Sequence, residues 1–116
     1  MINRAALLLR YREPAVVWIN ESDPYPEGRE LTLDEVNEER VIYLISEGES
    51  ESSLRAEKWV KANFRALFEN ELNAWYTDPS LWPSRLTYQL FQRWFDVEVH
   101  SMIIDTVGGE IVDDET

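Results

Sequence analysis

The only histidine of the chain, His100, lies two residues after Glu98 in a segment that alternates polar and apolar residues. On a β-strand, residues two apart project from the same face, so the imidazole and the carboxylate would be neighbours. Such a pair can act as a general base or provide two metal ligands. Asp96 would add a second carboxylate, and oxygen ligands suit Ca²⁺ or Mg²⁺. We take Glu98, His100 and Asp96 as candidate catalytic residues, the alternative being polar residues on a solvated strand face.

The residue types and their spacing do not indicate thiolate, serine-nucleophile or phosphate-binding chemistry. The chain has no cysteine, which excludes thiolate nucleophiles, zinc–thiolate sites and iron–sulfur clusters. No serine lies in a Gly-x-Ser-x-Gly turn, and the adjacent Gly108 and Gly109 precede no helical segment that could hold a phosphate. We therefore predict no cofactor and no metal site, and we favour a protein that is not an enzyme.

The charge of the chain narrows its possible partners. Acidic residues outnumber basic ones 23 to 11, which gives a net charge of −12. The excess is strongest in residues 66–116, which hold ten acids and two bases. A field of this sign repels phosphate backbones and anionic lipids, so direct nucleic-acid binding and membrane binding are not expected. A basic protein surface or a second copy of the chain remains as the expected partner.

Hydrophobic patterns predict three strands, at residues 5–11, 40–46 and 97–104. Helices are expected over 14–20, over one or two turns after Thr32, over 54–76 and around 86–95. The predicted fold class is α+β, with a small three-stranded sheet covered on one face by helices in the order β-α-α-β-α-α-β. The continuous apolar run of the first strand predicts a central position, and right-handed crossovers predict parallel neighbours.

We expect a single domain over residues 1–107, followed by a flexible acidic tail at 108–116. The apolar run from Ala5 to Leu9 is too short to be a signal-peptide core, and no other apolar run approaches the roughly 20 residues of a membrane span. These observations predict a cytoplasmic protein.

Three aromatic residues gather at a proline-marked corner between the two last helices. Trp75 and Tyr76 end the long helix, and Trp82 precedes Pro83. Exposed Trp and Tyr side chains are typical of interaction hot spots, so we predict that Trp75, Tyr76 and Trp82 bind a partner. The alternative is a small core that fixes the corner.

The segments "EERVIYLIS", "LNAWYTDPSLWPS" and "FDVEVHSMIIDT" resemble a family of small acidic bacterial proteins to which no activity is assigned. The resemblance covers residues 4–106 and implies a free-standing cytoplasmic protein, with no functional residue to transfer. From the sequence we predict a protein-binding or self-associating module. The alternatives are a metal-dependent or acid/base enzyme centred on Glu98 and His100, and a nucleic-acid mimic that inhibits a basic protein.

Overall fold

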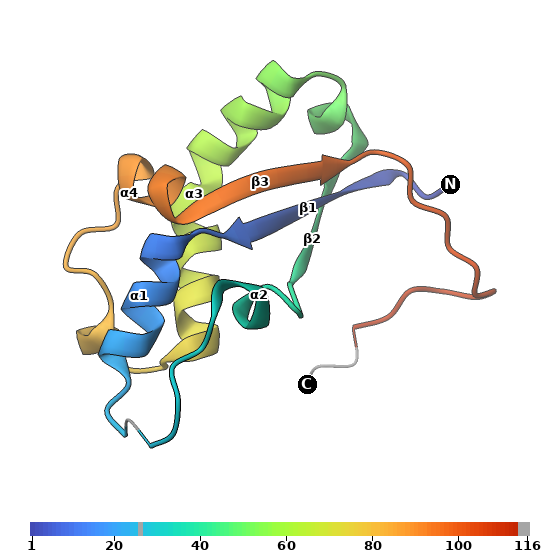
Figure 1. Cartoon of the computed structure of the whole chain (residues 1–116). Coiled ribbons are helices and arrows are strands. Elements are labelled where there is room, and N and C mark those ends of the chain that lie inside the picture. The colour runs from blue at the N-terminus through green and yellow to red at the C-terminus, as the bar shows by residue number, and fades with distance from the viewer. Residues whose placement is uncertain (26, 114–116) are drawn as a thin grey trace.

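The computed structural model describes residues 1–25 and 27–113, and it has a three-stranded sheet with helices packed on one face (Figure 1). The elements are β1 (Arg4–Tyr11), α1 (Glu13–Ser22), α2 (Leu33–Val36), β2 (Ile42–Ser46), η1 (Glu47–Ser50), α3 (Ser53–Trp75), η2 (Pro79–Leu81), α4 (Tyr88–Trp94) and β3 (Phe95–His100). This confirms the predicted α+β fold class and its order of strands and helices, to which the structure adds two short 3₁₀ turns.

The sheet order is β2-β1-β3, which confirms the central position of the first strand. Both neighbours run antiparallel to β1, so the expectation of parallel neighbours was wrong. For β2 the reason lies in Asn37, whose side-chain oxygen accepts from the Tyr11 amide at 2.8 Å and whose amide nitrogen donates to the Tyr11 carbonyl at 3.0 Å. The loop is thereby held at the end where β1 finishes, and β2 starts there and runs back along it.

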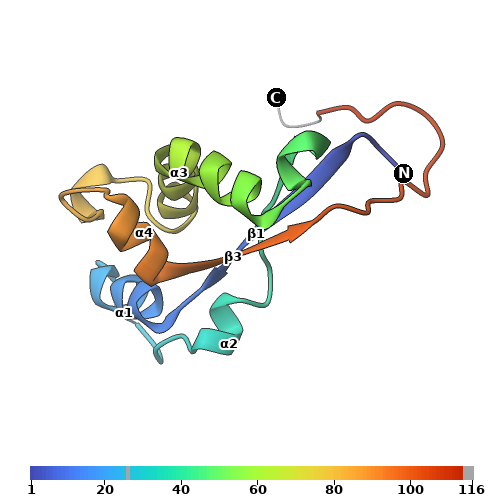
Figure 2. The ribbon, with the colours of Figure 1, turned by 90° about the horizontal axis from the view of Figure 1, so that it is seen from above.

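Side chains along β1 point alternately to the two faces of the sheet, of which one is covered by helices and the other is open. Ala5, Leu7, Leu9 and Tyr11 point toward the helices and are buried. The long helix α3 lies along that face, while α1 and α4 close the end of the sheet where β1 finishes (Figure 2). Burial of each large apolar side chain in this core contributes roughly 1.5–3 kcal/mol, so the covered face holds the fold together.

Helices α2, α3 and α4 each begin after a residue whose side chain caps the helix. The Ser52 hydroxyl accepts from the Arg55 amide at the start of α3, and Thr32 forms a reciprocal capping box with Glu35 in α2. Residues three and four apart along α3 face the sheet and are buried: Val60, Leu67, Phe68 and Leu72. These contacts confirm the apolar stripe expected for the long helix.

The third strand begins and ends earlier than the predicted 97–104. It starts at Phe95, directly after α4, because Phe95 pairs with Tyr11 at the end of β1. It stops at His100, whose partner is Ala6, because β1 begins only two residues before Ala6. A single backbone bond, from the Ile2 amide to the Ile103 carbonyl at 3.0 Å, continues the pairing.

Residues 101–113 contain no helix or strand, and they loop outward at the end of the sheet opposite α1 (Figures 1 and 2). Of the predicted acidic tail, residues 114–116 lie outside the described residues. The domain boundary at 107 stays a prediction.

Candidate functional site

Glu98 and His100 project from the same face of β3, the open face of the sheet, as their spacing predicts. The two side chains do not form a close pair, because His100 Nε2 lies 3.7 Å from Glu98 Oε2, beyond hydrogen-bond range. The His100 side chain is 63% exposed. An imidazole in this position is open to solvent, and Glu98 approaches it only to the distance of a loose ion pair.

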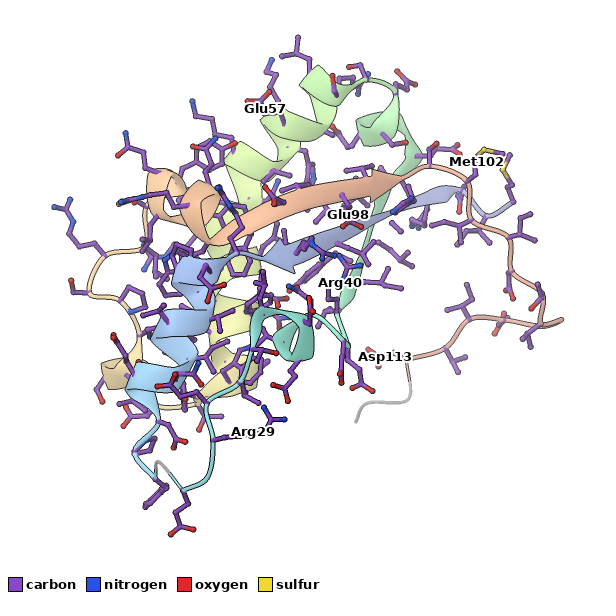
Figure 3. The ribbon with its side chains drawn as sticks, in the orientation of Figure 1. Arg29, Arg40, Glu57, Glu98, Met102 and Asp113 are labelled. Atoms are coloured by element: carbon purple, nitrogen blue, oxygen red, sulfur yellow. The ribbon has the colours of Figure 1, made fainter. Side chains whose placement is uncertain are left out.

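The partner that Glu98 does have is Arg40, which sequence reasoning did not assign. Arg40 Nη1 donates to Glu98 Oε1 at 3.0 Å, and Figure 3 shows the two side chains directed toward each other. The hydrogen bond from Arg40 holds the pKa of Glu98 below its ordinary value. Because the residue of β1 that pairs with Glu98 is Leu8, this ion pair spans the central strand on the open face.

Asp96 also lies on β3, in register with Arg10 of β1. Within residues 1–25 and 27–113, no three carboxylate or imidazole side chains are grouped so that they could hold a metal ion. The geometry thus brings Asp96, Glu98 and His100 into one row, in which Glu98 forms an ion pair with Arg40. An enzymatic role for these residues stays a prediction.

The aromatic corner is tied together by hydrogen bonds inside the chain. The Trp82 indole donates to the Tyr76 carbonyl at 2.7 Å, and the Trp75 indole donates to the Tyr11 hydroxyl at 3.0 Å. The Tyr76 hydroxyl donates to the carbonyl of Ile19 in α1. All three predicted partner-binding residues are half-buried, and each uses its polar atom internally.

Trp18 of α1 completes this corner. Its indole donates to the Leu81 carbonyl at 2.9 Å, and its ring meets the Tyr76 ring edge-on, with centroids 5.3 Å apart. Contacts of this kind support the alternative in which the rings fix the corner. Binding of a partner by Trp75, Tyr76 and Trp82 stays a prediction.

A buried carboxylate beside this corner escaped sequence analysis. Glu71 of α3 is only 5% exposed, and it accepts from the Tyr11 hydroxyl at 2.7 Å and from the Tyr43 hydroxyl. Burial, reinforced by the negative charge of Glu71, raises the pKa of both tyrosines well above the ordinary value. The cluster joins α3 to β1 and β2. The position of Glu71, four residues after the buried Leu67 and four before the half-buried Trp75, was a signal for it.

The other half of the open face is apolar. Ile42 and Leu44 of β2 point away from the helices and are 59% and 49% exposed. Their partners on β1 are Leu8 and Ala6, so an apolar strip runs across the two strands. Large exposed aliphatic residues side by side on a sheet are uncommon unless they are an interaction surface.

The chain after β3 extends this apolar strip. A groove of about 510 Å³ is lined by both β2 residues and by side chains of the segment after His100. We define the open patch as Ala6 together with the exposed large apolar residues of this groove, namely Ile42, Leu44, Met102, Ile104 and Ile111. In Figure 3, Met102 lies just beyond the end of β3.

Comparison of the chain with protein-family models, with curated proteins and with solved structures gives no match. In the described part of the chain, no helix has the length and apolar character needed to cross a lipid bilayer. We therefore infer function from the geometry alone.

Proposed function

We propose that the protein is a self-associating module, and that two copies bind each other through the open patch. The observation that carries this proposal is the exposure of Ile42 and Leu44 side by side on a sheet face that no helix covers in the described residues. Met102, Ile104 and Ile111 are exposed around the same groove. Burial of this surface between copies would remove it from water.

The size of the patch supports a weak dimer. Each of its five large side chains exposes on the order of 100 Å² of apolar surface, so each copy offers about 500 Å². The two copies together would bury about 1,000 Å², which is at the lower end for specific interfaces. Because area alone does not set affinity, we expect a dissociation constant in the micromolar range.

Charge explains why the partner would be a second copy. A net charge of −12 makes copies repel at long range. On the open face itself the charges are balanced, since Arg10 and Arg40 accompany Asp96 and Glu98. A two-fold axis through such a face sets the apolar strip against its own copy and can pair opposite charges.

The test is sedimentation of the protein from about 1 to about 500 µM, which brackets a micromolar dissociation constant. The wild-type protein should become dimeric over this range, and Ile42→Glu should stay monomeric. The matched control is Leu54→Glu, because Leu54 is 67% exposed on the first turn of α3 and does not line the groove. Circular dichroism of each variant verifies the fold.

The dependence of dimer formation on salt concentration is an independent test of the proposal. Screening weakens the repulsion between two acidic chains more than it weakens apolar contacts, so added salt should strengthen the dimer. A wild-type protein that is monomeric at all these concentrations would refute the proposal. So would a dimer that Ile42→Glu leaves intact, since association would then use another surface.

A further inference from the structure

A second groove runs beside β3 on the helical side of the sheet. It measures about 460 Å³ and is lined by α3, by the start of α4 and by β3, with Ala56, Glu57, Val60, Tyr88, Val97 and Val99 among its residues. A smaller groove of about 230 Å³ shares Glu57, Val60, Tyr88 and Val97 with it and continues it to Asp96. We call the two together the β3 groove; it follows the strand over most of its length.

The β3 groove lies next to a free strand edge. β3 is outermost in the sheet, and within residues 1–25 and 27–113 no strand pairs with its far side. Outward-directed N–H and C=O groups on such an edge are available to an added strand. β2 is outermost as well, but its inward side chains are covered: Ile45 is 4% exposed and Tyr43 bonds to Glu71 of α3, whereas Val97 of β3 is 40% exposed.

The walls of the groove define which strand would fit. Ala56, Val60 and Val97 provide an apolar floor. On the other side of β3, Asp96 is exposed on the open face. Side chains of an extended peptide alternate between the two faces, so aliphatic residues would enter the groove while the residues between them would lie beside Asp96.

We propose that the β3 groove binds an extended segment of a partner protein, with alternating aliphatic and basic residues, which adds as a fourth strand. The distance along the strand from Val97 to Ser101, at about 3.3 Å per residue, accommodates about five residues. Basic residues are selected at the positions between the aliphatic ones, because these positions project on the open face, where Asp96 is exposed. Glu57, which projects from the first half of α3 (Figure 3), lines the groove on the helical side. This partner is distinct from the second copy proposed for the open patch.

The probe is the capped peptide Lys-Val-Lys-Val-Lys, titrated into isotope-labelled full-length protein and followed by amide chemical shifts. We expect the shifts to concentrate on Val97, Val99 and Ser101 of the strand side and on Ala56 and Val60 of α3. The anionic peptide Glu-Val-Glu-Val-Glu should leave the spectrum unchanged. Added salt should weaken this binding, opposite to its effect on the dimer.

Asp96→Lys should weaken binding of the basic peptide about five-fold, since an exposed ion pair is worth up to about 1 kcal/mol. Glu38→Lys makes the same change of sign at an exposed position outside the groove and should leave the affinity unaltered. If Asp96→Lys alters the fold, Asp96→Asn replaces it with a smaller expected loss. Equal binding of the anionic peptide, shifts located on other surfaces, or no shifts at all would overturn the proposal.

Discussion

Replacement of Glu71 by glutamine should destabilise the protein although it changes only one atom. The carboxylate is 5% exposed and accepts hydrogen bonds from the Tyr11 and Tyr43 hydroxyls. A glutamine oxygen can accept from one hydroxyl, but its NH₂ group then faces the other, whose proton loses its acceptor. Hydrogen bonds to a charged acceptor are worth about 1.5–3 kcal/mol, so we expect a loss of about 2 kcal/mol in the free energy of unfolding.

The assay is urea or thermal unfolding followed by tryptophan fluorescence, at protein concentrations where the dimer is dissociated. For a chain of this length, about 2 kcal/mol corresponds to a fall of roughly 8 °C in Tm. The matched control is Glu69→Gln, on the exposed side of the same helix. Its carboxylate pairs with Arg65 at 2.9 Å, and such a surface pair is worth at most about 0.5 kcal/mol.

A double-mutant cycle identifies the hydrogen bond as the cause. Tyr43→Phe should destabilise the wild-type protein more than it destabilises Glu71→Gln, with a coupling energy of about 1 kcal/mol. If Glu71→Gln is as stable as Glu69→Gln, or if the two changes at Glu71 and Tyr43 are additive, the buried cluster does not join α3 to the sheet in the way described.

Two further predictions concern the tyrosines and the corner. Because the folded-state pKa of Tyr11 and Tyr43 is raised, the stability that their protonated forms provide is complete below about pH 10 and decreases as the pH rises further. Phenolate absorbance of these two residues should therefore appear only with unfolding, and ionisation before unfolding would contradict this. Trp82→Phe should lower the free energy of unfolding by about 1 kcal/mol, because the hydrogen bond to the Tyr76 carbonyl is lost. Unchanged stability together with lost association would show that the corner binds a partner.

Local patterns in the sequence were sufficient for most of the fold. The apolar run of β1 predicts its central position because a strand with neighbours on both sides is deeply buried, and the spacing of Val60, Leu67, Phe68 and Leu72 predicts the face of α3. The strand directions could not be read in this way. The direction of β2 depends on Asn37, a loop residue whose bonds to Tyr11 bridge 26 positions of the chain.

In the candidate site, too, the sequence predicts contacts between residues close together in the chain but not those between distant residues. The two-residue spacing of Glu98 and His100 predicts their shared face, which the structure has. The dominant partner of Glu98 is Arg40, which is 58 positions away, and no local pattern indicates it. Glu71 could have been found, because a carboxylate within an apolar helical stripe must have hydrogen-bond donors when it is buried.

The open patch could also have been predicted from the sequence. Residues 42–45 are apolar on both faces of a strand, which predicts cover on both sides, whereas helices cover only one face of the sheet in the described residues. Cover of the other face depends on tertiary and quaternary contacts, which local patterns in the sequence do not predict. The sequence supplies only the excess of apolar side chains.

The most direct test of self-association through the open patch is an isotope-filtered nuclear Overhauser experiment on an equal mixture of labelled and unlabelled protein. Such a spectrum records contacts between copies and none within a copy. We predict cross-peaks between the methyl groups of Ile42 and Leu44 of one copy and those of the other. Cross-peaks confined to Trp75 and Trp82, or their absence at the highest soluble concentration, would contradict the proposed interface.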